Sequence, residues 1–167
     1  LVFTHYHFDH VVGACRFPDE TVIVSHADLP ANQQAFNEPR LKDMIEKTYP
    51  ERIGAGQAKL DSLSASGSEA SGETADALEN LREQFEAAQE IRLVYPDSTF
   101  DDEMIIELGG QKIRLYHPGP AHTSGNIIVH FIDRRAVHMG DMLFYMRHPY
   151  IDWKAGSNTA NWVRTLE

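Results

Sequence analysis

The sequence THYHFDH at residues 4–10 places three histidines and one aspartate within six positions. Neutral imidazole nitrogens and carboxylate oxygens are ligands that zinc and similar divalent metals accept. Alternate side chains of an extended segment share one face, so we expect His5, His7 and Asp9 to converge. His10 breaks this alternation unless the chain turns at Asp9 into a helix, where it could serve a second metal. The stretch therefore predicts a metal site.

Two later segments offer further ligands. The run HPGPAHTSGN at residues 117–126 separates two strand-like segments and has the glycine and proline content of a tight functional loop, which makes His122 the fifth candidate. A short strand at residues 136–139 then ends in Gly140 and Asp141, and the second of these is the sixth candidate. Gly109 and Gly110 lie between two apolar runs and predict a β-hairpin. A second hairpin is expected around residues 133–135.

With these residues the chain resembles the metallo-β-lactamase superfamily, whose signature joins H-x-H-x-D-H, a distant histidine in an H-T-x-G-type loop and a Gly-Asp pair at a strand end. The resemblance covers residues 1–152. It implies an α/β fold, an αββα sandwich of two β-sheets with helices on both outer faces. It also implies two metal ions. His5, His7 and His122 would bind one ion, Asp9 and His10 would bind the other, and Asp141 would bridge the two. Asp9 and Asp141 are the carboxylates expected to act in catalysis.

Two departures from the family pattern concern the ends of the chain. In the family several strands precede the first motif, whereas three residues precede Thr4 here. In the family a last metal-binding histidine also follows the Gly-Asp pair by some tens of residues, whereas the sequence here runs only to residue 167. We therefore expect residues 1–167 to form a partial domain that lacks the N-terminal strands and the last ligand, and to be inactive alone. His148 is the only histidine after Asp141. We expect it to be an ordinary loop residue rather than a replacement ligand.

Composition limits the partners. The net charge of −10, from 15 Lys and Arg against 25 Asp and Glu, argues against nucleic acid, because phosphate binding needs a basic surface. No apolar run is long enough for a membrane span, and the single Cys15 excludes an internal disulfide and a multi-cysteine zinc site. We expect a small-molecule substrate. Localisation and oligomeric state stay open.

Residues 28–92 predict a helical insertion within the domain of residues 1–167. Leu41, Met44 and Ile45 share a helical face, as do Leu78, Leu81 and Phe85. Between the two helices, residues 62–73 are rich in serine and glycine and are expected to form a flexible connection. The insertion is either a wall over the metal site or an outer layer that covers a sheet or a second subunit.

The resemblance implies a hydrolase in which a hydroxide held by two zinc ions attacks an ester, thioester or amide-like bond. Aspartate at position 141 favours a thioester or ester over a lactam, because the best-known zinc β-lactamases carry Cys or Ser at the bridging position. Nitrogen and oxygen ligands also accept iron or manganese. The alternatives are an iron-dependent oxidoreductase similar to the persulfide dioxygenases, a β-lactamase, and a metal-binding module without catalysis.

Overall fold

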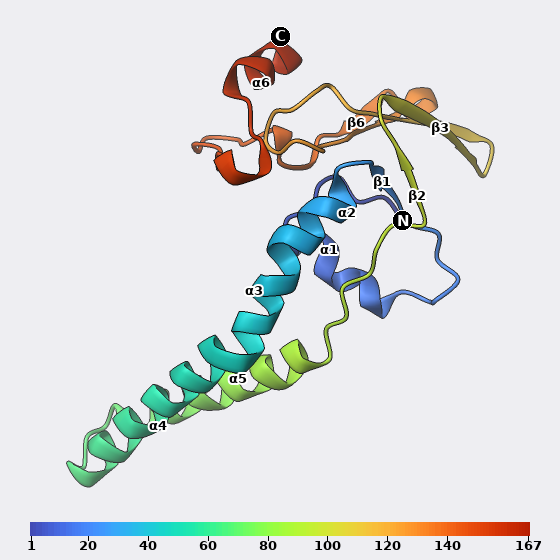
Figure 1. The fold of residues 1–167 in the computed structure, drawn as a ribbon. Helices are drawn as coiled ribbons and strands as arrows, with labels where there is room; N and C mark the ends of the chain where they lie inside the picture. Colours follow the sequence, from blue (N-terminus) through green and yellow to red (C-terminus); the bar gives the residue numbers. More distant parts are fainter. The chain divides into compact units, whose positions relative to one another are not determined.

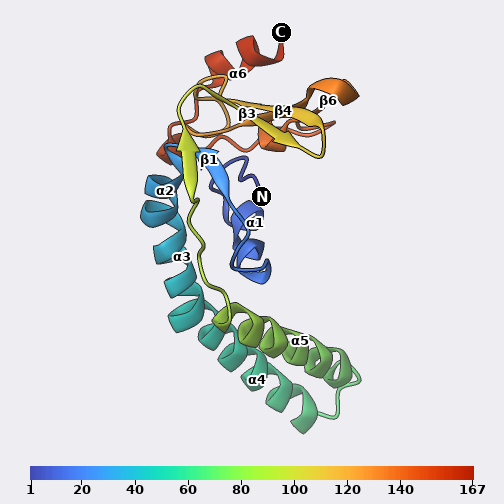
Figure 2. The ribbon, with the colours of Figure 1, turned by 90° about the vertical axis from the view of Figure 1, so that its right-hand side faces the viewer.

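The computed structural model describes residues 1–167, which divide into two compact units. The larger unit comprises Leu1–Asn37 and Leu93–Glu167, and the smaller comprises Glu38–Arg92. Figures 1 and 2 follow the chain through its helices and strands.

The first sheet of the larger unit pairs β1 (Val24–His26) with β2 (Ser98–Phe100) in parallel. The start of the chain lies beside β1, because the Val2–Val24 bridge is parallel and Phe3 N–H donates to the Val24 carbonyl at 3.0 Å. All three residues of β1 are buried, as in other parallel sheets covered on both faces. The strand begins at Val24, which has strand partners on both sides.

The second sheet is an antiparallel meander of β3 (Glu103–Leu108), β4 (Gln111–Tyr116), β5 (Ile128–Phe131) and β6 (Ala136–His138). Both predicted hairpins are confirmed. Gly109 and Gly110 have φ of 55° and 74°, the left-handed conformation that a two-residue hairpin turn requires. The β5–β6 turn contains the short helix η4 (Ile132–Arg134) and Arg135 in the same conformation, with φ of 52°.

The core of the larger unit consists of layers. One cluster packs Phe3 and Ile23, next to the first sheet, against helical residues including Val11 and Leu29. A second cluster joins the two sheets, and its members are Val24, Phe100, Leu115, Ile127 and Val129. A third packs Ile128 against Trp162 of α6 (Thr159–Leu166). The order is helix, sheet, sheet, helix, which confirms the expected sandwich.

The helices of the larger unit are short. They comprise α1 (Phe8–Val11), η1 (Val12–Arg16), α2 (Leu29–Asn32), the π-helical η2 (Gln33–Asn37), η5 (Gly140–Met142), η6 (Trp153–Ala155) and α6. The first helix begins at Phe8, because His7 already has the extended conformation of a residue that precedes a helix, with φ −53° and ψ 141°. Asp9 consequently lies in the first turn, where the helix dipole favours a negative charge.

The smaller unit contains α3 (Glu38–Asp43), the π-helical η3 (Met44–Thr48), α4 (Tyr49–Ala65) and α5 (Ser71–Gln89). The last two helices form a hairpin, visible in both Figure 1 and Figure 2. Tyr49 stacks on Phe85 with ring centroids 5.6 Å apart, and a Cβ at Gly56 would lie 3.1 Å from Leu78 Cδ1. The two predicted helices are therefore present. They extend into the expected connection of residues 62–73, so that only residues 66–70 are non-helical. None of the chain's helices has the length and apolar content needed to cross a membrane.

Candidate metal centre

Three imidazole nitrogens meet at one point of the larger unit. His7 Nδ1 lies 3.0 Å from His5 Nε2 and 3.0 Å from His122 Nε2. Both partner residues are 1% exposed. The extended segment before α1 turns alternate side chains to one face, so His5 and His7 converge as predicted. Ile127 N–H donates a hydrogen bond of 2.7 Å to the Thr4 carbonyl. This bond joins the start of the chain to the segment that follows the His122 loop, and so brings that loop beside His5 and His7.

The opposite ring nitrogens show where the protons are. His7 Nε2 lies 2.9 Å from Asp152 Oδ2, and His122 Nδ1 lies 3.1 Å from the Tyr150 carbonyl oxygen. An ionised carboxylate and a carbonyl can only accept, so each neutral imidazole must donate from that nitrogen. His7 Nδ1 and His122 Nε2 then face each other as lone pairs at 3.0 Å. Two facing lone pairs repel unless a cation lies between them.

This arrangement fits a divalent metal ion. Two nitrogens bound to one zinc at about 2.0–2.1 Å lie roughly 3.3 Å apart in a tetrahedral site, close to the separations found here. Ligating histidines also donate their other N–H to a carboxylate or a backbone carbonyl, which fixes the ring and its tautomer. His7 and His122 each have such a partner. His5 Nδ1 lies 3.2 Å from the Thr4 hydroxyl, which can donate or accept.

Asp141 lies beside the three imidazoles. One ligand atom from each of the four residues falls within 4.8 Å of all the others. Its Oδ2 is 3.7 Å from His122 Nε2 and its Oδ1 is 3.3 Å from His10 Nε2, so the two carboxylate oxygens are near different histidines. Gly140 precedes Asp141 and allows the chain to place it here. The φ of Gly140 is 53°, and a Cβ at this position would lie 3.0 Å from Thr4 Oγ1. Glycine meets both requirements.

Asp9 and His10 lie at the edge of this group. The His10 ring centroid is 4.2 Å from that of His5, and His10 Nε2 is 3.5 Å from Asp9 Oδ2. Asp9 does not follow the expected alternation, because it belongs to α1 rather than to an extended strand. Its side chain is 80% exposed. The structure thus brings together His5, His7, His122 and Asp141, and places His10 and Asp9 next to them.

Burial keeps two of the imidazoles neutral. It lowers the pKa of His5 far below the usual histidine range, and the neighbouring imidazoles of His10, His7 and His122 lower it further. Burial and His7 lower the pKa of His122 to about 4, although Asp141, the Tyr150 carbonyl and Asp152 act in the opposite direction. A histidine must be neutral to bind a metal. Both side chains are therefore in the metal-binding form at neutral pH.

Asp152 is a site residue that the sequence did not single out. It is 5% exposed, and its carboxylate accepts hydrogen bonds from the Tyr6 hydroxyl, from His7 Nε2 and from Ala155 N–H. Burial raises the pKa of this carboxyl, but the hydrogen bonds from Tyr6, His7 and Ala155 outweigh burial and hold it below the usual value. The contact joins residues 145 positions apart. No local pattern at either end indicates it.

Asn126 is the last residue of the loop motif and holds the loop around His122. Its Oδ1 accepts from Ala121 N–H at 3.2 Å and from Thr123 N–H at 3.1 Å, on either side of His122. Its Nδ2 donates to the Gly119 carbonyl at 3.3 Å. The side chain is buried and so fixes the loop that carries His122. Asparagine commonly bonds nearby backbone in turns, which is the signal that could have identified it.

The remaining histidines lie outside the cluster. His148 is exposed, in agreement with an ordinary loop residue. His26 and His117 stack on each other with ring centroids 3.9 Å apart, and His117 Nδ1 donates to the Asn126 carbonyl. Burial and the neighbouring His117 lower the pKa of His26. These two rings support the His122 loop rather than the metal ligands themselves.

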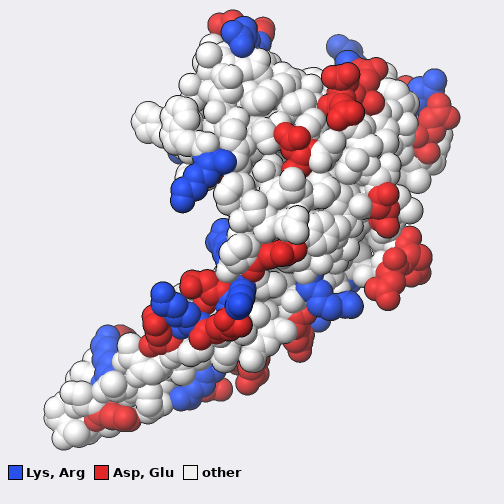
Figure 3. Space-filling model, in the orientation of Figure 1, with Lys and Arg blue, Asp and Glu red and all other residues white.

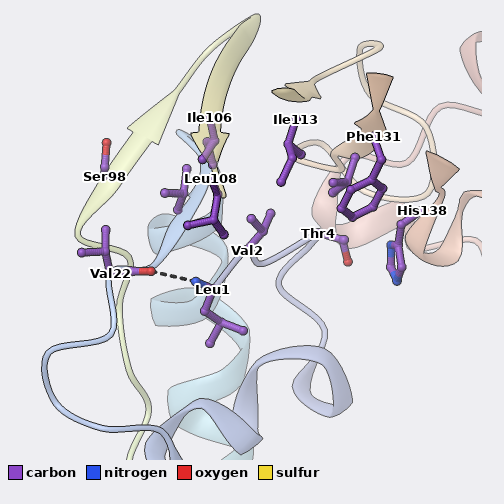
Figure 4. A pocket seen from close by; sticks show the side chains of 12 residues that line it. Leu1, Val2, Thr4, Val22, Ser98, Ile106, Leu108, Ile113, Phe131 and His138 are labelled. Atoms are coloured by element: carbon purple, nitrogen blue, oxygen red, sulfur yellow. Dashed lines mark hydrogen bonds between the residues drawn. The ribbon is translucent and has the colours of Figure 1, made fainter. Parts of the chain in front are cut away.

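A separate apolar pocket of about 700 Å³ lies between the two sheets (Figure 4). Most of its lining is aliphatic or aromatic: Leu1, Val2, Val22, Val24, Ile106, Leu108, Ile113, Val129 and Phe131, with Thr4, Ser98 and His138 as the polar members. A hydrogen bond of 2.9 Å ties the Leu1 amino group to the Val22 carbonyl at its edge. The pocket holds no group of ligands comparable to the histidine cluster, so we place the chemistry at the cluster.

Comparison with known proteins agrees with this geometry. Residues 1–166 match the sequence model of the metallo-beta-lactamase superfamily. The chain is 25% identical over 166 residues to proteins named acyl-coenzyme A thioesterase MBLAC2 from Bos taurus and Homo sapiens, with 99% of this chain and 48% of each relative covered. It therefore spans about half the length of these relatives. A solved structure named metallo-beta-lactamase from Pontibacter korlensis has the same fold, with a TM-score of 0.55, 15% identity and coverage of 99% of this chain and 53% of that one. The chain belongs to the metallo-β-lactamase superfamily.

Proposed function

We propose that the protein is a metal-dependent hydrolase that cleaves a small thioester or ester. The observation that carries this proposal is the pair of imidazole lone pairs, His7 Nδ1 and His122 Nε2, that face each other at 3.0 Å beside His5 and Asp141. Membership of the superfamily and the similarity to thioesterases support a hydrolase. The bond cleaved and the number of metal ions belong to the proposal.

The proposed ligand sets are those that the family resemblance implies, and the grouping of His5, His7, His122 and Asp141 supports them. His5, His7 and His122 would hold one ion, Asp9 and His10 would hold a second, and Asp141 would contact both. The carboxylate of Asp141 supports this sharing, since one oxygen lies 3.7 Å from His122 Nε2 and the other lies 3.3 Å from His10 Nε2. Zinc suits nitrogen and oxygen ligands of this kind, and iron or manganese would also be accepted.

A bound divalent ion would lower the pKa of a coordinated water to about 7 and polarise the carbonyl of the substrate. The chain's own residues supply the rest. Asp152 and the Tyr150 carbonyl hold the His7 and His122 rings in one tautomer. Asp9, with its exposed carboxylate, would bind the second ion from the solvent side. Cys15 Sγ donates to the Val12 carbonyl within η1 and is not needed as a nucleophile.

The surface next to the cluster suits an acyl thioester. The segment after Asp141 exposes five large apolar side chains, which are Leu143, Tyr145, Met146, Tyr150 and Trp153. The Tyr150 ring lies 5.7 Å from the His7 ring, so this apolar surface reaches the cluster. Arg147 and Lys154 belong to the same segment and are exposed. In Figure 3, a basic side chain lies below the uncharged lobe at the upper left, and both basic and acidic side chains lie at the top. An acyl group on an anionic thiol carrier would match both features.

The test is a hydrolysis assay on the full-length protein. Metal-free protein is reconstituted with zinc and given acyl-coenzyme A substrates of several chain lengths, with release of free thiol as the readout. A chromogenic cephalosporin is the matched lactam substrate. We expect thiol release that a chelator abolishes and zinc restores. Thioester turnover that survives chelation, or turnover of the lactam alone, would contradict the proposal. Oxygen uptake without hydrolysis would replace it with an oxidoreductase.

A further inference from the structure

Tyr6 and His7 use the same oxygen of one buried carboxylate. The Tyr6 hydroxyl donates to Asp152 Oδ2, and His7 Nε2 lies 2.9 Å from that same atom. Ala155 N–H occupies the other oxygen, Oδ1, at 3.3 Å. Tyr6 is 6% exposed and Asp152 is 5% exposed, so neither can exchange its partner for water at low cost.

Tyr6 is held in place by its ring and by its backbone. Its ring belongs to the core cluster of Phe3 and Val11 and lies 5.3 Å from the Phe36 ring. Its backbone carbonyl accepts a hydrogen bond of 2.6 Å from Asn37 Nδ2, which is itself buried. A tyrosine held in this way presents its hydroxyl at one position. The Asp152 carboxylate is therefore braced by a rigid donor on one side and by the Ala155 backbone on the other.

We propose that Tyr6 is a positioning residue for the metal centre: its hydroxyl holds the Asp152 carboxylate against His7 Nε2 and so keeps the His7 Nδ1 lone pair turned toward His5 and His122. The role extends the proposed function, on which it rests only for the identity of the group bound by the cluster. Partners of this kind, one step removed from the ligands, commonly contribute about 10-fold to 100-fold to metal affinity. Tyr6 adds a second such step, because it acts through Asp152.

A purely structural role would give a different result. If the Tyr6 hydroxyl only satisfied a buried carboxylate, removing it would lower the stability of the metal-free protein and leave the His7 tautomer and the metal affinity unchanged. Tyr6→Phe removes the oxygen and keeps the ring in the core. Tyr116→Phe is the matched control, because Tyr116 lies in the same unit under the Arg114 guanidinium and does not contact the cluster.

The experiment measures zinc affinity and tautomer in the full-length protein. Zinc dissociation constants come from competition with a chromophoric chelator, and the His7 tautomer of the metal-free protein comes from nitrogen-15 NMR of the histidine rings. We expect Tyr6→Phe to raise the dissociation constant of the more tightly bound zinc ion by at least about 10-fold. It should also reduce the fraction of His7 rings that carry the proton on Nε2. Tyr116→Phe should change neither. In an Asp152→Asn background, Tyr6→Phe should have little further effect, because the two residues act in series.

The outcomes separate this inference from the proposed function. Unchanged zinc affinity and tautomer in Tyr6→Phe would overturn the inference even if the protein hydrolyses thioesters. Equal and additive losses in the natural and Asp152→Asn backgrounds would also overturn it, because Tyr6 would then not act through Asp152. If the natural protein bound no zinc, the proposed function would fail. The NMR comparison would still decide whether Tyr6 fixes the His7 ring.

Discussion

At the residue scale, the centre depends on which nitrogen of each histidine carries the proton. Asp152 accepts from His7 and the Tyr150 carbonyl accepts from His122, so both rings must turn a lone pair inward. The sequence predicted that these residues lie together but not their tautomers, because the two acceptors are distant in the chain. The backbone carbonyl of Tyr150 carries no side-chain signal at all.

His7→Ala should remove both metal and turnover. His7 Nδ1 is within 3.0 Å of both other imidazoles, so its loss opens the set of ligands at its centre. We expect the loss in zinc affinity to exceed about 100-fold, the upper end of what an outer partner contributes. His148→Ala is the control, because His148 is exposed and lies outside the cluster. Zinc titration and thiol release measure both effects. Normal zinc binding in His7→Ala would contradict the assigned ligand set.

Gly140→Ala should be more harmful than Gly109→Ala. Both glycines have positive φ, a conformation that costs other residues about 1–2 kcal/mol. Only Gly140 is also crowded, since a Cβ there would meet Thr4 Oγ1 at 3.0 Å, whereas nothing lies within 4 Å at Gly109. We expect Gly109→Ala to lose about 1 kcal/mol of unfolding free energy. Gly140→Ala should lose more than this and should also lose zinc affinity. Equal losses in both variants would show that the close approach to Thr4 has no effect.

At the element scale, short loops anchored on strand ends deliver the ligands. The hairpin glycines, the loop after β4 and the Gly-Asp pair were predictable from the sequence, because turn residues have local signatures. The helix start at Phe8 and the exposed position of Asp9 were not, since His7 ends the extended segment earlier than alternation suggests. The two helices of the smaller unit followed from apolar spacing. The mobility of residues 62–73 stays a prediction.

Asn126 offers a test of the loop that carries His122. Asn126→Ala removes the acceptor of two buried N–H groups, at Ala121 and Thr123, and each unsatisfied group costs about 1–3 kcal/mol. Asn126→Asp keeps an acceptor oxygen and should lose less. Chemical denaturation and zinc titration of both variants measure the difference. If the alanine variant were as stable as the natural protein, the loop would not depend on this side chain.

At the scale of the whole molecule, the sandwich brings residue 7 to residue 152 and residue 5 to residue 122. The fold class followed from the motif order and the resemblance. The pairing of Tyr6 and His7 with Asp152 did not, because it arises only when η6 packs beside the first sheet through Ala155. The sequence thus predicted the proposed ligands better than the residues that orient them.

The metal-free protein should lose stability as the pH falls below about 6.5. The folded chain keeps His122 neutral down to a pKa of about 4 and lowers the pKa of His5 and His26 as well, whereas unfolding restores the ordinary value of 6.5. The unfolded chain therefore binds more protons between these values, so the unfolding free energy decreases from pH 6.5 toward pH 4. Denaturation in a chelating buffer measures it. An unfolding free energy that is constant across this range would contradict the assigned burial of these histidines.

Metal analysis of the full-length protein, purified without chelators and then reconstituted, tests the central claim most directly. Elemental analysis should find about two divalent ions per chain, as expected for a two-metal centre. Asp141→Ala, which removes the carboxylate between His122 and His10, should reduce that content and abolish thioester hydrolysis. A natural protein that binds no divalent metal after reconstitution, or an Asp141→Ala variant with full metal content and full activity, would contradict the account.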